Sequence, residues 1–329
     1  MVNIIRFDNI YIKEYASCVG KNEGEGPLGD CFDLKENDMR FGEDSWEMAE
    51  AELSRRCIEM LLNKSGVKGE DVALVTGGDL LNQCIASAFA VSGSDIPYLG
   101  LYGACSTCAE GMIVGASMAE KMGKDVISFA SSHFCSAEKQ YRFPLEYGGQ
   151  RTPTSQSTVT GCGSFLLSGS GKIKVTEGLI GRIKDGNITD ANNMGAAMAP
   201  AAADTLMRYF ISTGTSPKDF DVIATGDLGV EGFELAKQLM MTGGVVMGDS
   251  FTDCGIMIYD APKQDMHSGG SGCGCSASVM AGHFCRLLEK GEIKKMLLIG
   301  TGALLSKISA FQGKTIPAVA HLVKLESVC

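Results

Sequence analysis

The chain has 329 residues, a net charge of −10 and no stripe of lysine and arginine to neutralise phosphates, so we expect no nucleic-acid partner. Hydrophobic residues make up 45% and charged residues 21%, as in soluble globular proteins, and no apolar run approaches the roughly 18 residues of a membrane span. The 13 cysteines are spread through a long chain without a signal-peptide pattern, which predicts reduced thiols in the cytosol.

The first predicted elements are a helix and a strand. Asp44 and Glu47 have the spacing of a capping pair, and the apolar residues after them follow helical spacing as far as Gly66. The apolar run 72–75, which follows Asp71, then predicts a strand, which exits through Thr-Gly-Gly to Asp79. Ligands of such sheets bind at the carboxyl ends of strands, so Asp79 is a candidate ligand-binding residue. Capping of the following turn is the alternative for this side chain.

A glycine-cysteine turn between a strand and a helix comes next. Cys105 begins a predicted helix that ends at Gly123, and the same pattern returns with the same spacing at Cys273 and Gly291. A cysteine in the first turn of a helix meets unpaired N–H groups and the positive end of the helix dipole. Such a position lowers a thiol pKa and attracts anions. Cys105 is therefore a candidate nucleophile or part of an anion site, with an ordinary buried cysteine as the alternative.

The segment 131–151 is predicted to be a long functional loop. It follows an apolar strand, and its aromatic residues argue against disorder. Four of its side chains are candidates for binding an anion: His133, Lys139, Arg142 and Arg151. Two alternatives stay open, namely that His133 lies at a dimer contact and that the arginines pair with Glu138 and Glu146.

The second half of the chain repeats the order of the first. Pro200 opens a predicted helix that ends at Gly214, and the next apolar strand again exits through Thr-Gly to an aspartate, Asp227. Continuous apolar strands between helices indicate parallel sheets covered on both faces. We therefore expect an α/β protein of two tandem, pseudo-symmetric halves, residues 1–178 and 179–329.

Eight segments of the chain, in order, resemble the stage V sporulation protein AD family of the thiolase-like superfamily. They are GGDLLNQ at 77–83, GACST at 103–107, SSH at 131–133, EYGGQ at 146–150, TVTG at 158–161, MAPAAAD at 198–204, GGSGC at 269–273 and TGALLS at 301–306. The resemblance covers essentially the whole chain. It implies a five-layered αβαβα subunit that usually forms a homodimer.

The resemblance also implies a function. It implies a non-catalytic protein of the spore that binds dipicolinate (pyridine-2,6-dicarboxylate), takes part in its uptake during sporulation, and acts in its release in germination. Such a protein lies peripherally on the cytoplasmic side of the spore inner membrane, beside the membrane-embedded transport proteins of the SpoVA complex. No cofactor is implied, and whether calcium accompanies dipicolinate is left open. A flat dianion of this kind favours Arg or Lys side chains and backbone N–H groups.

Acyl transfer by Cys105 is the alternative function. Thiolases and ketoacyl synthases need a base for the thiol and groups that hold an oxyanion. Cys105 matches the nucleophile of these families, and His267 lies near the thiolase histidine loop with altered spacing, which makes His267 a ligand-binding candidate. Asp227 and Thr301 stand where the families carry a histidine and a cysteine. We therefore expect no catalysis and a neutral Cys105 beside a dianion; a structural scaffold is the third alternative.

A zinc site is a further alternative for the cysteines at the two turns. The cysteines concerned are Cys105, Cys108, Cys273 and Cys275. Their pairs open helices inside apolar strand–helix units, and only one of them has the C-x-x-C spacing typical of zinc sites. We therefore expect no metal.

Overall fold

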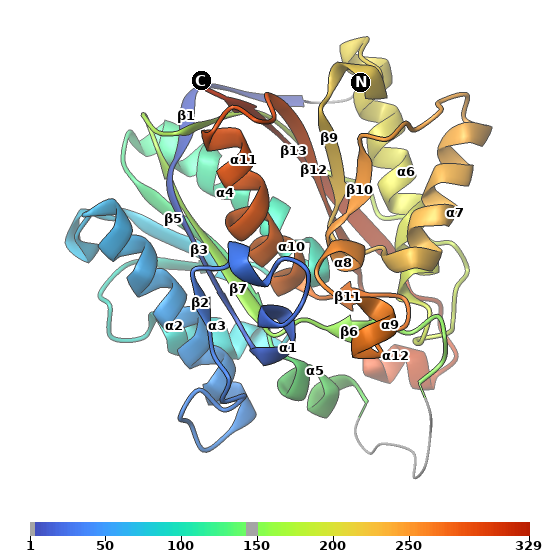
Figure 1. Ribbon diagram of the computed structural model, residues 1–329, viewed down its shortest axis with the longest axis horizontal. Helices are drawn as coiled ribbons and strands as arrows, with labels where there is room; N and C mark the ends of the chain where they lie inside the picture. The colour runs from blue at the N-terminus through green and yellow to red at the C-terminus, as the bar shows by residue number, and fades with distance from the viewer. Residues whose placement is uncertain (1–3, 143–150) are drawn as a thin grey trace.

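The computed structural model describes residues 4–142 and 151–329. Its main sheet has the strand order β10-β9-β12-β13-β8-β1-β7-β5-β3-β4, with β2 beside β1 (Figure 1). The strands of the first half are β1 (Ile4–Val19), β2 (Leu34–Lys35), β3 (Leu74–Gly78), β4 (Tyr98–Gly100), β5 (Val126–Ser132) and β7 (Gly161–Ser168). Those of the second half are β8 (Ile173–Leu179), β9 (Val222–Thr225), β10 (Phe251–Asp253), β12 (Lys295–Ala303) and β13 (Ala318–Ser327).

Two half-sheets with one topology make up this sheet. The orders β4-β3-β5-β7-β1 and β10-β9-β12-β13-β8 have the same connections and the same strand directions. Strand β1 joins them, because its first residues pair with β8 and its last with β7. The predicted duplication is therefore confirmed. The expected division after residue 178 falls within β8, the first strand of the second half-sheet.

The half-sheets are mixed, whereas the sequence predicted parallel sheets. In each, three neighbouring strands are parallel, the fourth (β7 or β13) runs antiparallel to them, and the fifth (β1 or β8) is antiparallel to the fourth. A continuous apolar run shows that a strand is buried on both faces, but it does not set the direction of that strand. The prediction was wrong for this reason.

Helices cover the outer faces of the two half-sheets and fill the space between them (Figure 1). Outside the first lie α2 (Trp46–Ser65) and α3 (Ile85–Val91), and outside the second lie α6 (Met194–Thr213) and α7 (Gly229–Thr242). The middle layer holds α4 (Thr107–Met122), α10 (Cys273–Val279) and α11 (Cys285–Glu289), with a π-helical turn at Met280–Phe284 between α10 and α11. Five layers result, as expected.

The remaining elements are short and lie around the middle layer. They are α1 (Lys21–Gly24), α5 (Phe134–Tyr141), α8 (Cys254–Met257), α9 (Ala261–Gln264), α12 (Lys307–Phe311), and the strands β6 (Ser157–Thr158) and β11 (Gly270–Ser271). Within the described ranges, none of the helices combines the length and apolarity needed to cross a bilayer.

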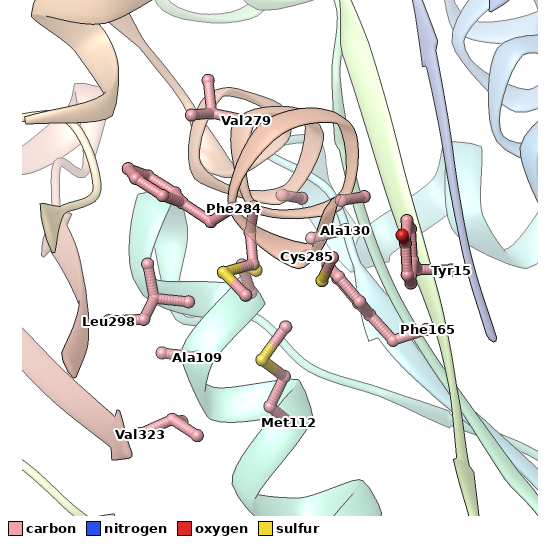
Figure 2. Packing of buried hydrophobic residues seen from close by; sticks show 14 of the residues in the cluster. Tyr15, Ala109, Met112, Ala130, Phe165, Val279, Phe284, Cys285, Leu298 and Val323 are labelled. Carbon is pink, nitrogen blue, oxygen red and sulfur yellow. The ribbon is translucent and has the colours of Figure 1, made fainter. Parts of the chain in front are cut away.

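The main hydrophobic cluster surrounds the middle helices. Figure 2 shows Met112 of α4 and Phe284 beside α11 pointing into one core, which Phe165 of β7 and Leu298 of β12 enter from the two half-sheets. All four side chains are buried. Because both half-sheets pack on the same helices, the strand ends that carry Cys105 and its counterpart turn are brought to one place.

The helix ends follow the predicted glycines. Gly66, Gly123 and Gly214 each follow the last residue of a helix with a left-handed φ of 68°, 63° and 68°, respectively, which glycine adopts without strain. Two predicted starts were wrong. Ser45, not Asp44, accepts the hydrogen bond from the Met48 N–H that caps α2.

The start of α6 also differs from the prediction. Asn193 caps this helix by accepting from the Ala196 N–H at 3.1 Å, which places Pro200 inside the helix instead of at its first turn. The side-chain cap at Asn193 therefore sets the start of this helix, and the preference of proline for the first turn does not. The predicted loop 131–151 likewise begins with a helix, α5, because His133 caps it through Nδ1 and the Cys135 N–H.

Candidate functional site

A cavity of about 310 Å³ lies beside Cys105, between the two halves of the molecule. Its polar lining includes Tyr102, Cys105, Tyr141, Arg142, Gln156 and Ser271, and leucines at 80, 304 and 305 supply much of the apolar wall. The volume lies at the lower end of the roughly 300–1,000 Å³ of small-molecule sites. The cavity therefore suits a small ligand with a flat apolar body and a few polar groups.

The turn that carries Cys105 is strained and firmly held. Ala104 has a left-handed φ of 52°, which costs a non-glycine residue on the order of 1 kcal/mol. The hydroxyl of Ser106 donates to the Gly103 carbonyl at 2.7 Å, and that of Thr107 donates to the Ala104 carbonyl at 2.7 Å. These bonds fix the turn and hold the Cys105 thiol at the cavity wall.

Three segments meet opposite Cys105 in a hydrogen-bonded network. Asp227, at the end of β9, accepts from the Ser271 hydroxyl at 2.8 Å, from the Gly272 N–H at 2.9 Å and from the Thr301 hydroxyl at 2.8 Å. The Ser271 Oγ lies 3.8 Å from the Cys105 Sγ. Both oxygens of the Asp227 carboxylate are thus engaged, and the carboxylate also interacts directly with the Cys105 thiol.

Burial dominates the electrostatics of this network. Burial raises the pKa of Asp227 to about 7, and this effect exceeds that of the hydrogen bonds, which lower the same pKa. Burial, followed by the negative charge of Asp227, raises the pKa of the Cys105 thiol well above its ordinary value. A raised pKa favours the neutral thiol, in agreement with the expectation for Cys105. The helix start does not lower the thiol pKa, because the desolvation is larger.

Asp227 predicts a pH dependence of stability. Its folded pKa of about 7 lies above the ordinary value of 3.8, so its contribution to stability is present below about pH 4 and is lost as the pH rises to about 7. An Asp227→Asn variant, which has no carboxyl to titrate, is expected to lose less stability across this range, by up to about 1.4 kcal/mol per pH unit. Urea unfolding at several pH values measures the difference, and parallel curves for the two proteins contradict the prediction.

Arg142 is the predicted cation that lines the cavity. Its Nε lies 3.6 Å from Glu138 Oε1, one turn earlier on α5, and no described residue accepts a hydrogen bond from its terminal nitrogens. Arg151 lies 4.0 Å from the same Glu138 oxygen, donates to the Ser157 hydroxyl and stacks over the Phe134 ring. The pairing with Glu138 that the sequence left open thus occurs for both arginines. Glu146 and the rest of 146–150 lie outside the described residues.

The structure does not bring Lys139 or His133 to the cavity. Lys139 projects to the surface and pairs with Glu47 at 2.5 Å. His133 is buried, with Nε2 at 2.8 Å from the Met39 carbonyl, Nδ1 bonded to the Cys135 N–H and its ring against Trp46. Both ring nitrogens are therefore used: Nδ1 caps α5, and Nε2 ties the start of α5 to the loop before α2.

Asp79 and His267 also lie outside the cavity lining. Asp79 accepts from the Leu81 N–H at 2.7 Å and from the Ser87 N–H and hydroxyl at 2.7 and 2.6 Å, so it caps the turn after β3. His267 lies on the loop before β11, with Nε2 3.7 Å from Asp265. For Asp79 the capping alternative accounts for all the described contacts of the carboxylate.

Three polar residues of the site had no assigned role in the sequence analysis. Ser271 and Gln156 reach the cavity because β11 pairs with β6, in the register Gly270 to Ser157. Thr301 reaches Asp227 because β12 lies beside β9. A serine, a glutamine and a threonine carry no local signal of a binding site; the hints were the glycine-rich setting of Ser271 and the place of Thr301 where the related families carry a cysteine.

Among the described residues, no group of three or more His, Cys, Asp or Glu side chains is placed to hold a metal ion. The cysteines of the two turns are each buried, and all 13 cysteines, every one of them described, are free.

Solved structures share this fold at low sequence identity. A variant of Xanthomonas campestris OleA superimposes with a TM-score of 0.59 at 12% identity, over 98% of this chain and 99% of that one. The 3-oxoacyl-[acyl-carrier-protein] synthase III of Aquifex aeolicus gives 0.55 at 11% identity, over 99% and 100%. The priming β-ketosynthase of the R1128 polyketide pathway gives 0.57 at 14% identity, over 96% and 97%. These likenesses show that the fold is thiolase-like, as expected, and they show the fold alone.

Sequence comparison gives the family. A family model described as stage V sporulation protein AD matches residues 3–326. The stage V sporulation protein AD of Bacillus subtilis (strain 168) is 39% identical over 319 residues, which are 96% of this chain and 94% of that protein. The chain therefore belongs to the stage V sporulation protein AD family, and it is a sporulation protein with a thiolase-like fold.

Proposed function

We propose that this protein binds dipicolinate without catalysis in the cavity beside Cys105. In this role it takes part in dipicolinate uptake during sporulation and in dipicolinate release in germination. The observation that carries the proposal is Arg142, whose terminal nitrogens donate to no acceptor among the described residues and lie at the wall of a cavity of about 310 Å³. A guanidinium binds a carboxylate through two parallel hydrogen bonds, and the apolar walls suit a flat ring.

The surroundings of Cys105 support binding over acyl transfer. The thiol is buried and neutral, and its hydroxyl neighbour Ser271 donates to Asp227. None of the four histidines of the chain, all of them described, lines the cavity. A cysteine nucleophile needs a base that removes its proton, and the carboxylate of Asp227 is already engaged by Ser271, Gly272 and Thr301.

The setting in the cell is part of the same proposal. The protein lies peripherally on the cytoplasmic side of the spore inner membrane, beside the membrane-embedded transport proteins of the SpoVA complex, and uses no cofactor. With a net charge of −10, direct contact with anionic lipid is disfavoured, so protein partners supply the attachment.

Two measurements on the purified chain test the function. Titration calorimetry with pyridine-2,6-dicarboxylate is expected to give saturable one-site binding. Incubation with acetyl- and malonyl-coenzyme A, followed by intact mass measurement, is expected to leave the chain unmodified. A stable thioester on Cys105 together with no dicarboxylate binding would overturn the proposal in favour of acyl transfer. If the chain neither binds the dicarboxylate nor becomes acylated, the remaining alternative is a structural scaffold.

We also propose that the protein is a homodimer joined at β4. This strand ends the sheet among the described residues, and Leu99 on it is 43% exposed, with exposed Phe89 nearby on α3. An exposed apolar edge strand invites pairing with a second chain. A Leu99→Lys variant is expected to sediment as a monomer at concentrations where the native chain is a dimer. The matched control is Ile211→Lys, which alters an exposed residue of α6, and it should remain dimeric.

The proposed β4 interface is contradicted if the native chain sediments as a monomer, or if the Leu99→Lys variant still sediments as a dimer. Circular dichroism of each variant establishes that the fold is retained, so that a change in sedimentation reports the association alone.

A further inference from the structure

A cysteine and a histidine that are far apart in the sequence lie side by side outside the cavity lining. The Sγ atom of Cys31 is 3.9 Å from the Nδ1 atom of His283, within the longer range of hydrogen bonds that involve sulfur. Both side chains are partly exposed, and neither lines the cavity beside Cys105. A thiol beside an imidazole is a nucleophile beside a base, the pairing that activates a cysteine for attack.

The segment that carries Cys31 is held close to the helix that carries His283. The Cys31 N–H donates to the Leu28 carbonyl at 2.8 Å, and the next side chain, Phe32, is 6% exposed in the main hydrophobic cluster. Gly282 allows the approach, because a Cβ atom there would meet the Phe32 ring at 2.7 Å and the Cys31 carbonyl oxygen at 3.2 Å. These contacts place the thiol and the imidazole together before any reagent arrives.

His283 lies in the π-helical turn Met280–Phe284. Such a turn adds a residue to a helix, and single π-turns occur frequently at functional sites. Burial lowers the pKa of His283 below its ordinary value of 6.5, and the charge of Glu292 opposes this shift only in part. The ring is therefore neutral at pH 7, and with its proton on Nε2 it accepts from the Cys31 thiol through Nδ1.

Each carboxylate beside the pair has a cationic partner. The ion pairs are Asp33 with Arg286 and Lys64, Asp30 with Lys35, and Glu292 with Lys290. These cations offset the negative charge that would otherwise oppose a developing thiolate at Cys31.

We propose that Cys31 is a modification site at which small-molecule disulfides form a mixed disulfide, with His283 as the base. His283 Nδ1 takes the thiol proton, and the Cys31 sulfur attacks one sulfur of the disulfide. A new S–S bond forms at Cys31, the S–S bond of the reagent breaks, and the other sulfur of the reagent leaves as a thiolate and takes up the proton. Cys31 is oxidised and the leaving sulfur is reduced, so the disulfide is the only oxidant required. Excess thiol reverses the step.

The other accessible cysteines lack this arrangement. Cys329 is exposed, but its thiol donates to a backbone carbonyl, that of Glu289, at 3.1 Å. Cys135 is partly exposed beside His133, whose Nδ1 accepts from the Cys135 N–H and whose Nε2 lies 2.8 Å from the Met39 carbonyl. The remaining cysteines are buried. Cys329 is accordingly the internal reference, a more exposed thiol without the base.

Reaction of the native chain with the uncharged 2,2′-dithiodipyridine at pH 7 tests the site, with peptide mass analysis at successive times to give the rate at each cysteine. Cys31 is expected to react at least about tenfold faster than Cys329, since a positioned base contributes about 10²–10⁴-fold. In a His283→Phe variant, Cys31 should slow by at least about tenfold and Cys329 by less than about twofold. The difference at Cys31 should shrink by pH 10, where thiols ionise without a base.

Three results would overturn the proposal. They are a native chain in which Cys329 reacts as fast as Cys31, a His283→Phe variant that keeps the native rate at Cys31, and a loss in that variant that is shared by Cys329 or persists at pH 10. Circular dichroism establishes whether the variant folds. If it does not, the comparison of Cys31 with Cys329 in the native chain decides.

Discussion

An Arg142→Ala variant is expected to bind pyridine-2,6-dicarboxylate about 30-fold more weakly than the native chain, or worse. The guanidinium of Arg142 lines the cavity, and no described residue accepts from its terminal nitrogens. Two charge-assisted hydrogen bonds to a carboxylate contribute about 2–4 kcal/mol together, and 2 kcal/mol corresponds to about 30-fold in affinity. Titration calorimetry of both proteins with the dicarboxylate measures the difference.

The matched control is Lys139→Ala. Lys139 lies on the same helix and carries the same charge, but it pairs with Glu47 at the surface. Removing it should change the affinity less than about twofold, since exposed charges are largely screened. Equal losses for the two variants would indicate a general effect of net charge and would contradict a specific role of Arg142.

A Gly163→Ala variant is expected to lower the free energy of unfolding by about 3 kcal/mol or more. Gly163 lies on β7 where α10 packs on the sheet, and a Cβ atom there would meet the Ala277 carbonyl oxygen at 2.1 Å. The clash is with backbone, so α10 must move away from the sheet, and overpacking of a core costs about 1–3 kcal/mol even where side chains relieve it. Urea unfolding, analysed for both midpoint and slope, measures the loss.

Gly169→Ala is the control for this prediction. Gly169 follows the end of the same strand, and a Cβ atom there would meet nothing within 4 Å. Its replacement should change stability by no more than about 0.5 kcal/mol in either direction. A Gly163→Ala protein as stable as the Gly169→Ala protein would show that the contact between β7 and α10 is loose.

The duplication of the strand–helix units could be predicted from the sequence, because the residues that mark the ends of these elements act locally. Helix ends at Gly66, Gly123 and Gly214 depend on the left-handed φ that glycine adopts, and each was placed correctly. Element starts were less certain, because several neighbouring residues can cap a helix. Ser45 and Asn193 act as the caps, where Asp44 and Pro200 were expected.

The site was only partly predictable. Cys105 and Arg142 line the cavity, as the turn and the cationic segment suggested. The composition of the segment could not separate Arg142 from Lys139, because their roles differ by the direction of each side chain: Lys139 leaves α5 toward the surface, and Arg142, just after α5, reaches the cavity. His133 was a candidate ligand by residue type, but its ring nitrogens serve the Met39 carbonyl and the start of α5.

The sequence by itself determined the family, the duplicated α/β plan and the position of Cys105, since motifs, apolar periods and glycine stops are properties of consecutive residues. The tertiary structure alone decided which polar groups share the cavity. Gln156 meets the Gly270 carbonyl across 114 positions of sequence, and Ser271 meets Asp227 across 44. Such contacts depend on strand pairing and on two half-sheets closing over shared helices, and no stretch of consecutive residues encodes them.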